Sequence, residues 1–326
     1  MRAWIHLRMS RTFRPFLALA FLLAAGPAMA EYPDRPIRIF LPFAPGGIGD
    51  ITFRLVTAKV SERTNMTFVI ENRPGAGGIA SAVAGKTAAP DGYTLAQVGN
   101  SYALGASLFK SLPFDVVRDF TPVAALAKFD VLLATRGGDL GSVAQLVAFD
   151  RAHPGKLNFG AISAGSTQNL AAEMFKMAIG SEATVVTFKS SPELILAMQR
   201  GDVDVGFDYL AAFSSAVAQG QLAIIASGGR ERGALTPDTP TVVESGWPDY
   251  VASSWNGVAA PAGTPADIVA RLNREMDEAL KSPDTRERLR LLGMEGVGGS
   301  PEAMAGLLKS DMSRWKGVID RLGLAQ

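Results

Sequence analysis

The sequence contains no cysteine and only two histidines among its 326 residues. Without cysteine the chain can form no disulfide bond, and it lacks the thiolate ligands of many metal sites. His6 lies in the first thirty residues, which leaves His153 as the one histidine of the remainder. Carboxylates are neither clustered at metal-ligand spacing nor paired for acid–base catalysis. We therefore predict no metal and no other cofactor.

Long apolar runs and a strong charge of one sign are missing as well. After residue 30, no stretch approaches the roughly 20 apolar residues that a membrane-spanning helix needs. The chain has 32 lysines and arginines against 31 aspartates and glutamates. Such a balance provides no basic surface for nucleic acid or for anionic lipid, and we expect neither as a partner.

The first thirty residues differ from the rest of the chain. They carry four arginines and no acidic residue, then the apolar run 16–25 and the small-residue sequence Ala28-Met29-Ala30. This pattern is typical of a secretory signal peptide cleaved before Glu31, and the apolar run is too short to span a bilayer. A retained N-terminal anchor is the alternative. Removing the leader leaves 28 basic and 31 acidic residues, a net charge near −3.

Beyond the leader, short β-rich runs alternate with amphipathic segments of about 10–18 residues. This alternation predicts βαβ units, and hence an α/β fold of mostly parallel sheets with helices on both faces. The predicted strands are residues 37–41, 67–70, 94–98, 122–127, 131–134, 157–160, 184–187, 203–207, 222–227 and 256–260.

The length of the chain suits two lobes better than a single core. Strands near 126–134 and near 251–257 are the places where the chain would pass between the lobes. We expect lobe one to comprise residues 31–127 and 255–326, and lobe two to comprise residues 128–254. Two lobes joined by paired crossings are suited to hinge closure around a ligand.

A glycine-rich segment, residues 42–49, follows a predicted buried strand and leads into a helix near Asp50; we call it the first loop. Its turn-forming residues are Pro45, Gly46, Gly47 and Gly49. Unpaired N–H groups and the positive dipole end at a helix N-terminus favour an anion, so we expect a small carboxylate here. Asp50 would cap the first turn and reach Arg54. A plain strand-to-helix turn is an equally good interpretation.

A dinucleotide-binding fold is a weaker interpretation of the same segment. Gly47-x-Gly49 follows a strand, and Glu71 ends the next strand at a suitable distance. However, Thr52 occupies the third small position of that motif, and an exported protein meets little NAD.

Residues 161–165, Ala-Ile-Ser-Ala-Gly, are similar to the G-x-S-x-G motif of serine hydrolases. A hydrolase using Ser163 would need a general base, and His153 precedes the serine instead of following it. The simpler interpretation is a second strand-to-helix loop, residues 163–167, whose hydroxyl and N–H groups face the same cleft; we call it the second loop. N-capping by Ser166 or Thr167 is the structural alternative.

Two charged residues also follow predicted strands. Lys189 could meet a carboxylate, although a solvated surface lysine is the more common case. Asp208 would either cap the following helix or contact the ligand. Ser191 is the predicted N-cap of another helix, with Pro192 at its first position.

Several ordered blocks together resemble the tripartite tricarboxylate transporter receptors, also called the Bug family. The resemblance runs from about Tyr32 to the C-terminus. The matching blocks are Tyr32-Pro33-x-x-Pro36-Ile37-Arg38, Pro42-Phe43-Ala44-Pro45-Gly46-Gly47 with Asp50 and Arg54, Glu71-Asn72-Arg73-Pro74-Gly75-Ala76-Gly77-Gly78, Ala89-Pro90-Asp91-Gly92-Tyr93-Thr94-Leu95, Pro237-Asp238-x-Pro240-Thr241-Val242 and Ser254-Trp255-x-Gly257-x-x-Ala260-Pro261-Ala262-Gly263-Thr264-Pro265.

The resemblance implies a periplasmic solute-binding receptor of the type II periplasmic-binding-protein fold, without catalysis. Two lobes would close on a small organic, amino or aromatic acid, and a membrane permease pair would be the partner of the monomeric receptor. An exported serine hydrolase is the alternative function. The ligand-binding residues carried over are Phe43, Ala44, Pro45, Gly46, Gly47 and Asp50 from lobe one, and Ser163, Gly165, Ser166, Thr167, Lys189 and Asp208 from lobe two.

Overall fold

The computed structural model describes residues 32–42, 45–73, 78–109 and 111–324. Contacts divide the chain into two units, Met1–Asp34 and Arg35–Gln326, and the second unit carries the fold. The predicted signal peptide lies outside the described residues. Among the described helices, none combines the length and the apolar character needed to cross a membrane.

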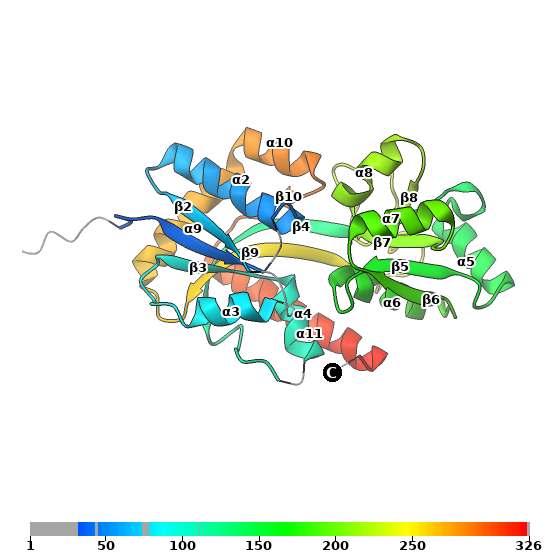
Figure 1. Ribbon diagram of the computed structural model, residues 1–326, viewed down its shortest axis with the longest axis horizontal. Coiled ribbons are helices and arrows are strands. Elements are labelled where there is room, and N and C mark those ends of the chain that lie inside the picture. Colours follow the sequence, from blue (N-terminus) through cyan, green and yellow to red (C-terminus); the bar gives the residue numbers. More distant parts are fainter. Residues whose placement is uncertain (1–31, 43–44, 74–77, 110, 325–326) are drawn as a thin grey trace, which may run out of the picture. The chain divides into compact units, whose positions relative to one another are not determined.

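Strands and helices alternate along the second unit (Figure 1). The strands are β1 (Ile37–Leu41), β2 (Phe68–Asn72), β3 (Thr94–Gly99), β4 (Phe120–Thr135), β5 (Asn158–Ile162), β6 (Thr184–Phe188), β7 (Val205–Tyr209), β8 (Ala223–Ser227), β9 (Ser253–Pro261) and β10 (Glu295–Gly296). The helices are α2 (Ile48–Arg63), α3 (Ile79–Lys86), α4 (Asn100–Leu108), α5 (Val143–Ala152), α6 (Thr167–Ile179), α7 (Ser191–Arg200), α8 (Leu210–Ala218), α9 (Ala266–Lys281), α10 (Pro283–Leu291) and α11 (Pro301–Leu322).

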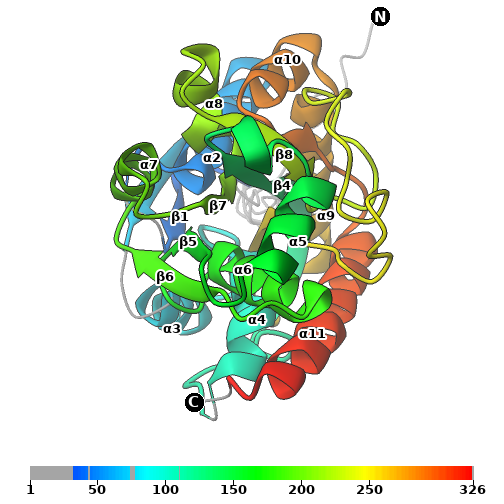
Figure 2. The same cartoon turned by 90° about the vertical axis from the view of Figure 1, so that its right-hand side faces the viewer.

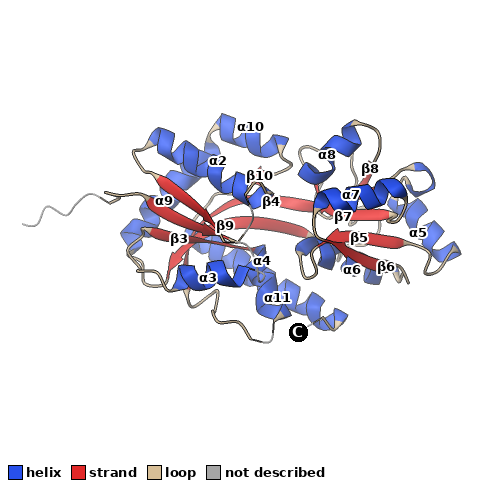
Figure 3. Ribbon diagram, viewed as in Figure 1, coloured by secondary structure: helices blue, strands red, loops and turns tan. Residues whose placement is uncertain are grey.

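The strands form one mixed sheet in the order β2-β1-β3-β9-β4-β7-β5-β6, with β8 and β10 also paired to β4 (Figure 3). Strands β1, β2 and β3 are parallel to one another, and so are β5, β6 and β7. The pairs β3–β9, β9–β4 and β4–β7 are antiparallel. The α/β class with parallel groups of strands is therefore confirmed.

This strand order makes the two parallel groups point toward each other. The last residue of β3, Gly99, is paired with Asn256, which is paired in turn with Ala127 of β4. The last residue of β7, Tyr209, is paired with Val131, which also belongs to β4. Val131 lies four residue steps after Ala127, which is about 13 Å along β4 at roughly 3.3 Å per residue. The carboxyl ends of both groups consequently face a short central stretch of β4.

Successive residues of β5 and β7 point to opposite faces of the sheet, and a different helix packs on each face. Phe159 and Phe207 pack against Phe175 of α6, with ring centroids 5.6 to 5.9 Å apart. Their neighbours Gly160 and Gly206 point to the opposite face, where an added Cβ would lie within 2.5 Å of atoms of α7. These two paired glycines let α7 approach the sheet closely, and Figure 2 shows this group end-on between its helices.

Some predicted elements need correction. Residues 122–127 and 131–134 were expected as separate strands, yet they belong to the single strand β4. The polar residues Lys128 and Asp130 interrupt the apolar pattern, but both still pair with β9. Helix α2 starts at Ile48, earlier than expected. The two-residue strand β10 was not anticipated.

Helix α11 is joined to the rest of the fold by hydrogen bonds, two of them buried. The Trp315 Nε1–H donates to Oδ1 of Asn100 at 2.5 Å, and the Trp255 Nε1–H donates to Oδ2 of Asp311 at 2.8 Å. The Arg314 guanidinium donates to the carbonyl of Val251 at 2.6 Å and lies over the Trp315 ring. Trp315 is fully buried. The core around it joins side chains from both predicted lobes, and the boundaries of those lobes stay a prediction.

We expect Trp315→Phe to lower the free energy of unfolding by about 1–3 kcal/mol beyond any packing loss, because Oδ1 of Asn100 would lose its buried donor. Urea denaturation measures this difference. Trp247→Phe is the matched control, since the Trp247 Nε1–H bonds to Ala178 near solvent. Equal losses in the two variants would show that the bond to Asn100 adds nothing.

Candidate functional site

The loops that follow the parallel strands gather where the two groups of strand ends face each other (Figure 1). The first loop follows β1, and α4 starts directly after β3. From the other side come the second loop after β5, the start of α7 after β6 and the start of α8 after β7. The carboxyl ends of parallel strands are where α/β folds place their ligand sites.

In the first loop, Asp50 organises the backbone. Oδ2 of Asp50 accepts from the Gly46 N–H at 2.9 Å and from Nε of Arg54 at 2.9 Å, while its Oδ1 accepts from Nδ2 of Asn72 at 2.8 Å. Burial alone would raise the pKa of this carboxyl, but the bonds from Arg54, Gly46 and Asn72 outweigh it and lower the pKa. The expected contact with Arg54 is confirmed.

These hydrogen bonds determine which groups of the first loop remain available to a ligand. The Gly46 N–H is engaged by Asp50, and Asp50 is only 2% exposed, so it shapes the loop from behind. Gly47 is the N-cap of α2 with an ordinary φ of −73°, and it is exposed together with Pro45 and Gly46. Helix geometry leaves the first N–H groups of α2 without intrahelical acceptors. Phe43 and Ala44 lie outside the described residues.

The second loop begins with residues in the left-handed backbone region and ends at the N-cap of α6. Ser163 has a φ of +47°, and Gly165 has a φ of +75°. The Gly165 N–H donates to Oδ1 of Asn169 at 3.0 Å. Oγ of Ser166 accepts from the Asn169 N–H at 3.1 Å and donates to the carbonyl of Ile162. Ser166 is therefore the N-cap of α6, as one alternative predicted, while Ser163 remains exposed.

Thr167 is engaged with the other group of strands. Its Oγ1 accepts from Nδ2 of Asn100 at 2.7 Å, and Asn100 is in turn held by Trp315. Asn100 and Thr167 are buried, and they stand at the starts of α4 and α6. This bond ties together the two sets of loops. Asn100 is not among the predicted ligand residues, although a polar residue two positions after the predicted strand 94–98 was a usable signal.

Asp208 lies at the end of β7 in a buried polar cluster. Oδ2 accepts from the hydroxyl of Ser191 at 2.6 Å, and Oδ1 accepts from Nε2 of Gln168 at 3.1 Å and from the Tyr209 N–H at 2.8 Å. Burial raises the pKa of Asp208, and these hydrogen bonds offset only part of the effect. The N-cap interpretation was wrong, because the N-cap of α8 is Tyr209, and Asp208 precedes the cap position.

Lys189 is exposed, in keeping with the surface-charge interpretation. Its main-chain N–H donates to Glu193 at 3.2 Å. The N-cap of α7 is Ser190, one residue before the predicted Ser191, which is free to contact Asp208 instead. Gln168 and Ser191 thus belong to the polar cluster, and only the packing of three elements brings them together.

The geometry opposes the hydrolase interpretation. His153 is the exposed C-cap residue of α5 and stacks on Phe149 at 4.4 Å. It precedes β5 while Ser163 follows β5, so the length of that strand, about 17 Å, separates them. The imidazole cannot take a proton from Ser163 at that distance. The described residues also contain no group of three or more potential metal ligands.

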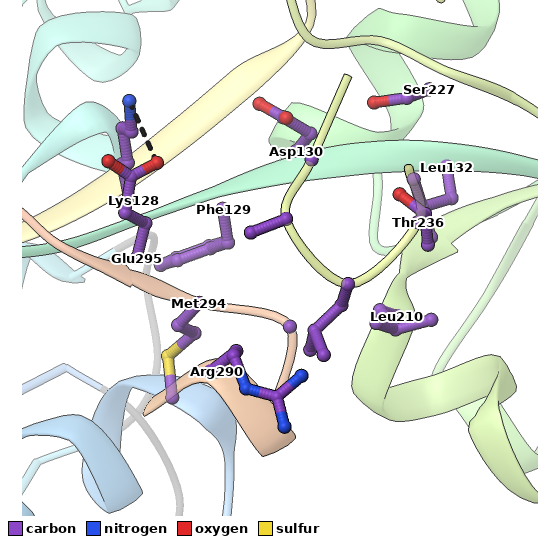
Figure 4. A pocket seen from close by; sticks show the side chains of 14 residues that line it. Lys128, Phe129, Asp130, Leu132, Leu210, Ser227, Thr236, Arg290, Met294 and Glu295 are labelled. Carbon is purple, nitrogen blue, oxygen red and sulfur yellow. Dashed lines mark ion pairs between the residues drawn. The ribbon is translucent and has the colours of Figure 1, made fainter. Parts of the chain in front are cut away.

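A cavity of about 70 Å³ lies beside the central stretch of β4 (Figure 4). Lys128, Phe129 and Asp130 line it together with Leu210, Met294 and residues of the 233–236 loop. None of the predicted ligand residues that the structure describes belongs to its lining. Burial raises the pKa of Asp130, against the effect of a 2.6 Å hydrogen bond from Ser253.

Asp208→Asn should remove a pH dependence of stability. Because the folded-state pKa of Asp208 is raised above its unfolded value of roughly 3.9, the wild type loses stability as pH rises through the folded pKa. An amide stays neutral and keeps partners for Ser191, Gln168 and Tyr209. We expect the stability of Asp208→Asn relative to wild type to increase from pH 4 to pH 7 in urea titrations. A constant difference across this range would contradict the assignment.

Comparisons with known proteins place the chain in a family. The model of the tripartite tricarboxylate transporter family receptor matches residues 52–324. Protein BugT of Bordetella pertussis is 32% identical over 312 residues, which are 94% of this chain and 95% of the relative. A UPF0065 protein of Cupriavidus necator is 32% identical over 309 residues, 93% of each chain.

Solved structures agree with this assignment. Rpa4515 of R. palustris, determined with adipate, is 33% identical with a TM-score of 0.82, covering 90% of this chain and 99% of its own. MatC of Rhodopseudomonas palustris, determined with bound malate, is 31% identical with a TM-score of 0.76, covering 88% and 100%. The fold is thus that of the periplasmic binding proteins, the hydrolase alternative finds no support, and the chain belongs to the tripartite tricarboxylate transporter receptor family.

Proposed function

We propose that this receptor binds a small carboxylic acid between its facing strand ends and releases it unchanged. The observation that carries the proposal is the opposed placement of two loop-to-helix junctions, at the start of α2 and at the start of α6. The relatives with bound adipate and malate support a carboxylate as the ligand class. An acid with a carboxylate at each end suits a site with one helix N-terminus on either side.

The binding groups are neutral donors. Gly47 and the first turn of α2 offer main-chain N–H groups, and the exposed Ser163 offers a hydroxyl from the other side. Arg54 already donates to Asp50, and the carboxylates of Asp50 and Asp208 are buried behind the loops. The ligand's charge would therefore be held mainly by helix dipoles and hydrogen bonds.

The two predicted lobes would move about the crossing strands. Lobe one would be residues 31–127 with 255–326, and lobe two residues 128–254. The register supports this, because β4 pairs with β9 over its first part and with β7 over its last part. The bond between Asn100 and Thr167 joins the two sides, and opening would separate its partners.

The predicted signal peptide and the family both favour a periplasmic protein. As a receptor of this family, the chain would deliver its ligand as a monomer to a membrane permease pair. No chemical step is required of it, and the separation of His153 from Ser163 agrees with a role without catalysis.

Gly47→Val should abolish binding of a carboxylate that the wild type binds, because its side chain would stand beside the first N–H groups of α2. The φ of −73° suits valine, so the fold should survive at a cost of about 1 kcal/mol for the poorer N-cap. A thermal-shift panel of dicarboxylates, citrate, amino acids and aromatic acids identifies the ligand, and calorimetry then compares the variants.

Gly306→Val is the matched control. Gly306 lies on the exposed face of α11, where an added Cβ meets no atom within 4 Å. It should bind with wild-type affinity. Wild-type affinity in Gly47→Val as well would mean that the first loop does not contact the ligand.

The absence of catalysis has its own test. Chromogenic esters should be hydrolysed no faster by the wild type than by Ser163→Ala, because His153, the expected general base, lies about a strand length, roughly 17 Å, from Ser163. Turnover that is present in the wild type and abolished in Ser163→Ala would refute the receptor-only role.

A further inference from the structure

Two amide side chains are buried near the end of β3 without hydrogen-bond partners. Gln97 of β3 is 0% exposed, and neither its Nε2 nor its Oε1 has a partner. Asn256 of β9 is 3% exposed, and its Nδ2 has none. Buried polar atoms in native proteins are almost always paired, because desolvation without a bond is costly. A purely structural role would be better filled by apolar side chains here.

The strand register places both amides on one face of the sheet. Gln97 is paired with Val258, and Gly99 is paired with Asn256, so these four residues share a face. A Cβ added to Gly99 would lie 2.7 Å from Nε2 of Gln97 and 3.4 Å from Cα of Asn256. The Gln97 side chain therefore extends along β3 toward its carboxyl end and lies over Gly99. Only glycine at that position leaves room for the amide.

This location adjoins the candidate site. Gly99 is the N-cap of α4, and the next residue, Asn100, bonds to Thr167 at the start of α6. The amide of Gln97 thus lies one residue from the polar contact that joins the two sets of loops.

The chemistry of the two amides limits what they can bind. Gln97 presents an acceptor and N–H donors, and Asn256 adds a further N–H donor. A carboxylate has no proton for Oε1 of Gln97, and an ammonium group cannot accept from the N–H donors. A hydroxyl group donates one hydrogen bond and accepts others, so it can donate to Oε1 of Gln97 and accept from Nδ2 of Asn256.

We propose that Gln97 and Asn256 form a selectivity subsite for a hydroxyl group on the bound acid, which makes hydroxy acids the preferred ligands. The inference rests on the proposed carboxylate function and deepens it. The helix N-termini hold the carboxylate, while the amides at the end of β3 distinguish a hydroxylated acid from its unsubstituted analogue. A site built to hydrogen-bond a hydroxyl rejects an analogue without it, because the buried amides are then left unpaired.

Calorimetry with matched acids tests the subsite. The pairs are succinate with malate, glutarate with 2-hydroxyglutarate, and adipate with 2-hydroxyadipate. The wild type should bind the hydroxylated member of at least one pair about tenfold more tightly or better. Gln97→Leu should reduce that ratio to about one while still binding the unsubstituted acid. Asn256→Leu should reduce the ratio in the same direction.

Two controls separate a lost subsite from a damaged fold. Gln97→Leu should melt at or above the wild-type temperature, because it replaces an unpaired buried amide with an apolar side chain of similar size. Gln221→Leu makes the same substitution at an exposed position, and it should keep the wild-type ratio.

Failure of this inference differs from failure of the proposed function. Equal affinity of the wild type for both members of every pair would overturn the subsite, with the amides holding buried water only. A preference that persists in Gln97→Leu would overturn it as well. Wild-type protein that binds none of the carboxylates, hydroxylated or not, would instead overturn the proposed function and the inference with it.

Discussion

The structure depends on the antiparallel pairing of β4 with both β9 and β7. Parallel βαβ units place every carboxyl strand end on one edge, which in a single continuous parallel sheet would face solvent. Here the long strand β4 runs through the sheet and pairs with β9 at one end and β7 at the other. The β1–β3 group and the β5–β7 group are therefore reversed relative to each other. Their loops therefore meet over the stretch of β4 between Ala127 and Val131 instead of facing solvent along one edge.

The loops at this junction are shaped by buried polar groups that leave other donors available. Asp50 holds the first loop through Gly46, Arg54 and Asn72, and its ionised form is favoured by those bonds. On the other side of the junction, Asp208 accepts hydrogen bonds from Ser191 and Gln168, but burial disfavours its charged form. The pKa of Asp50 is therefore lowered, while that of Asp208 is raised. Burial outweighs the neutral donors of Asp208, whereas the bonds that Asp50 accepts, one of them from a guanidinium, outweigh its burial.

A chain of contacts connects the C-terminal helix with these loops. Trp315 holds Asn100, Asn100 holds Thr167, and Thr167 begins α6. A buried hydrogen bond of this kind is worth little on balance but is costly to break on one side only. It therefore favours one arrangement of the two sets of loops. In the proposed movement of the two lobes, this bond would form in the closed arrangement and break on opening.

Local physical chemistry allowed much of the fold to be predicted. The β1 boundaries, the α/β alternation and the glycine turn before α2 follow from apolar runs and turn residues close in sequence. Family blocks added the receptor assignment. The prediction failed where distant contacts override the local pattern. Residues 128–130 were expected to separate two strands, but pairing with β9 keeps β4 continuous. Asp208 suggested a helix cap, but Ser191 and Gln168 hold its carboxylate.

The sequence by itself determined which segments would be strands, helices and turns, because those preferences are set by neighbours a few residues away. Only the tertiary structure decided which polar side chains meet. Asn100 and Thr167 are separated by 67 positions, and Trp315 bonds to Asn100 across 215. The unpaired amides of Gln97 and Asn256 also became visible only when β9 was placed beside β3. Burial and pairing are properties of the packed sheet, and no local pattern encodes them.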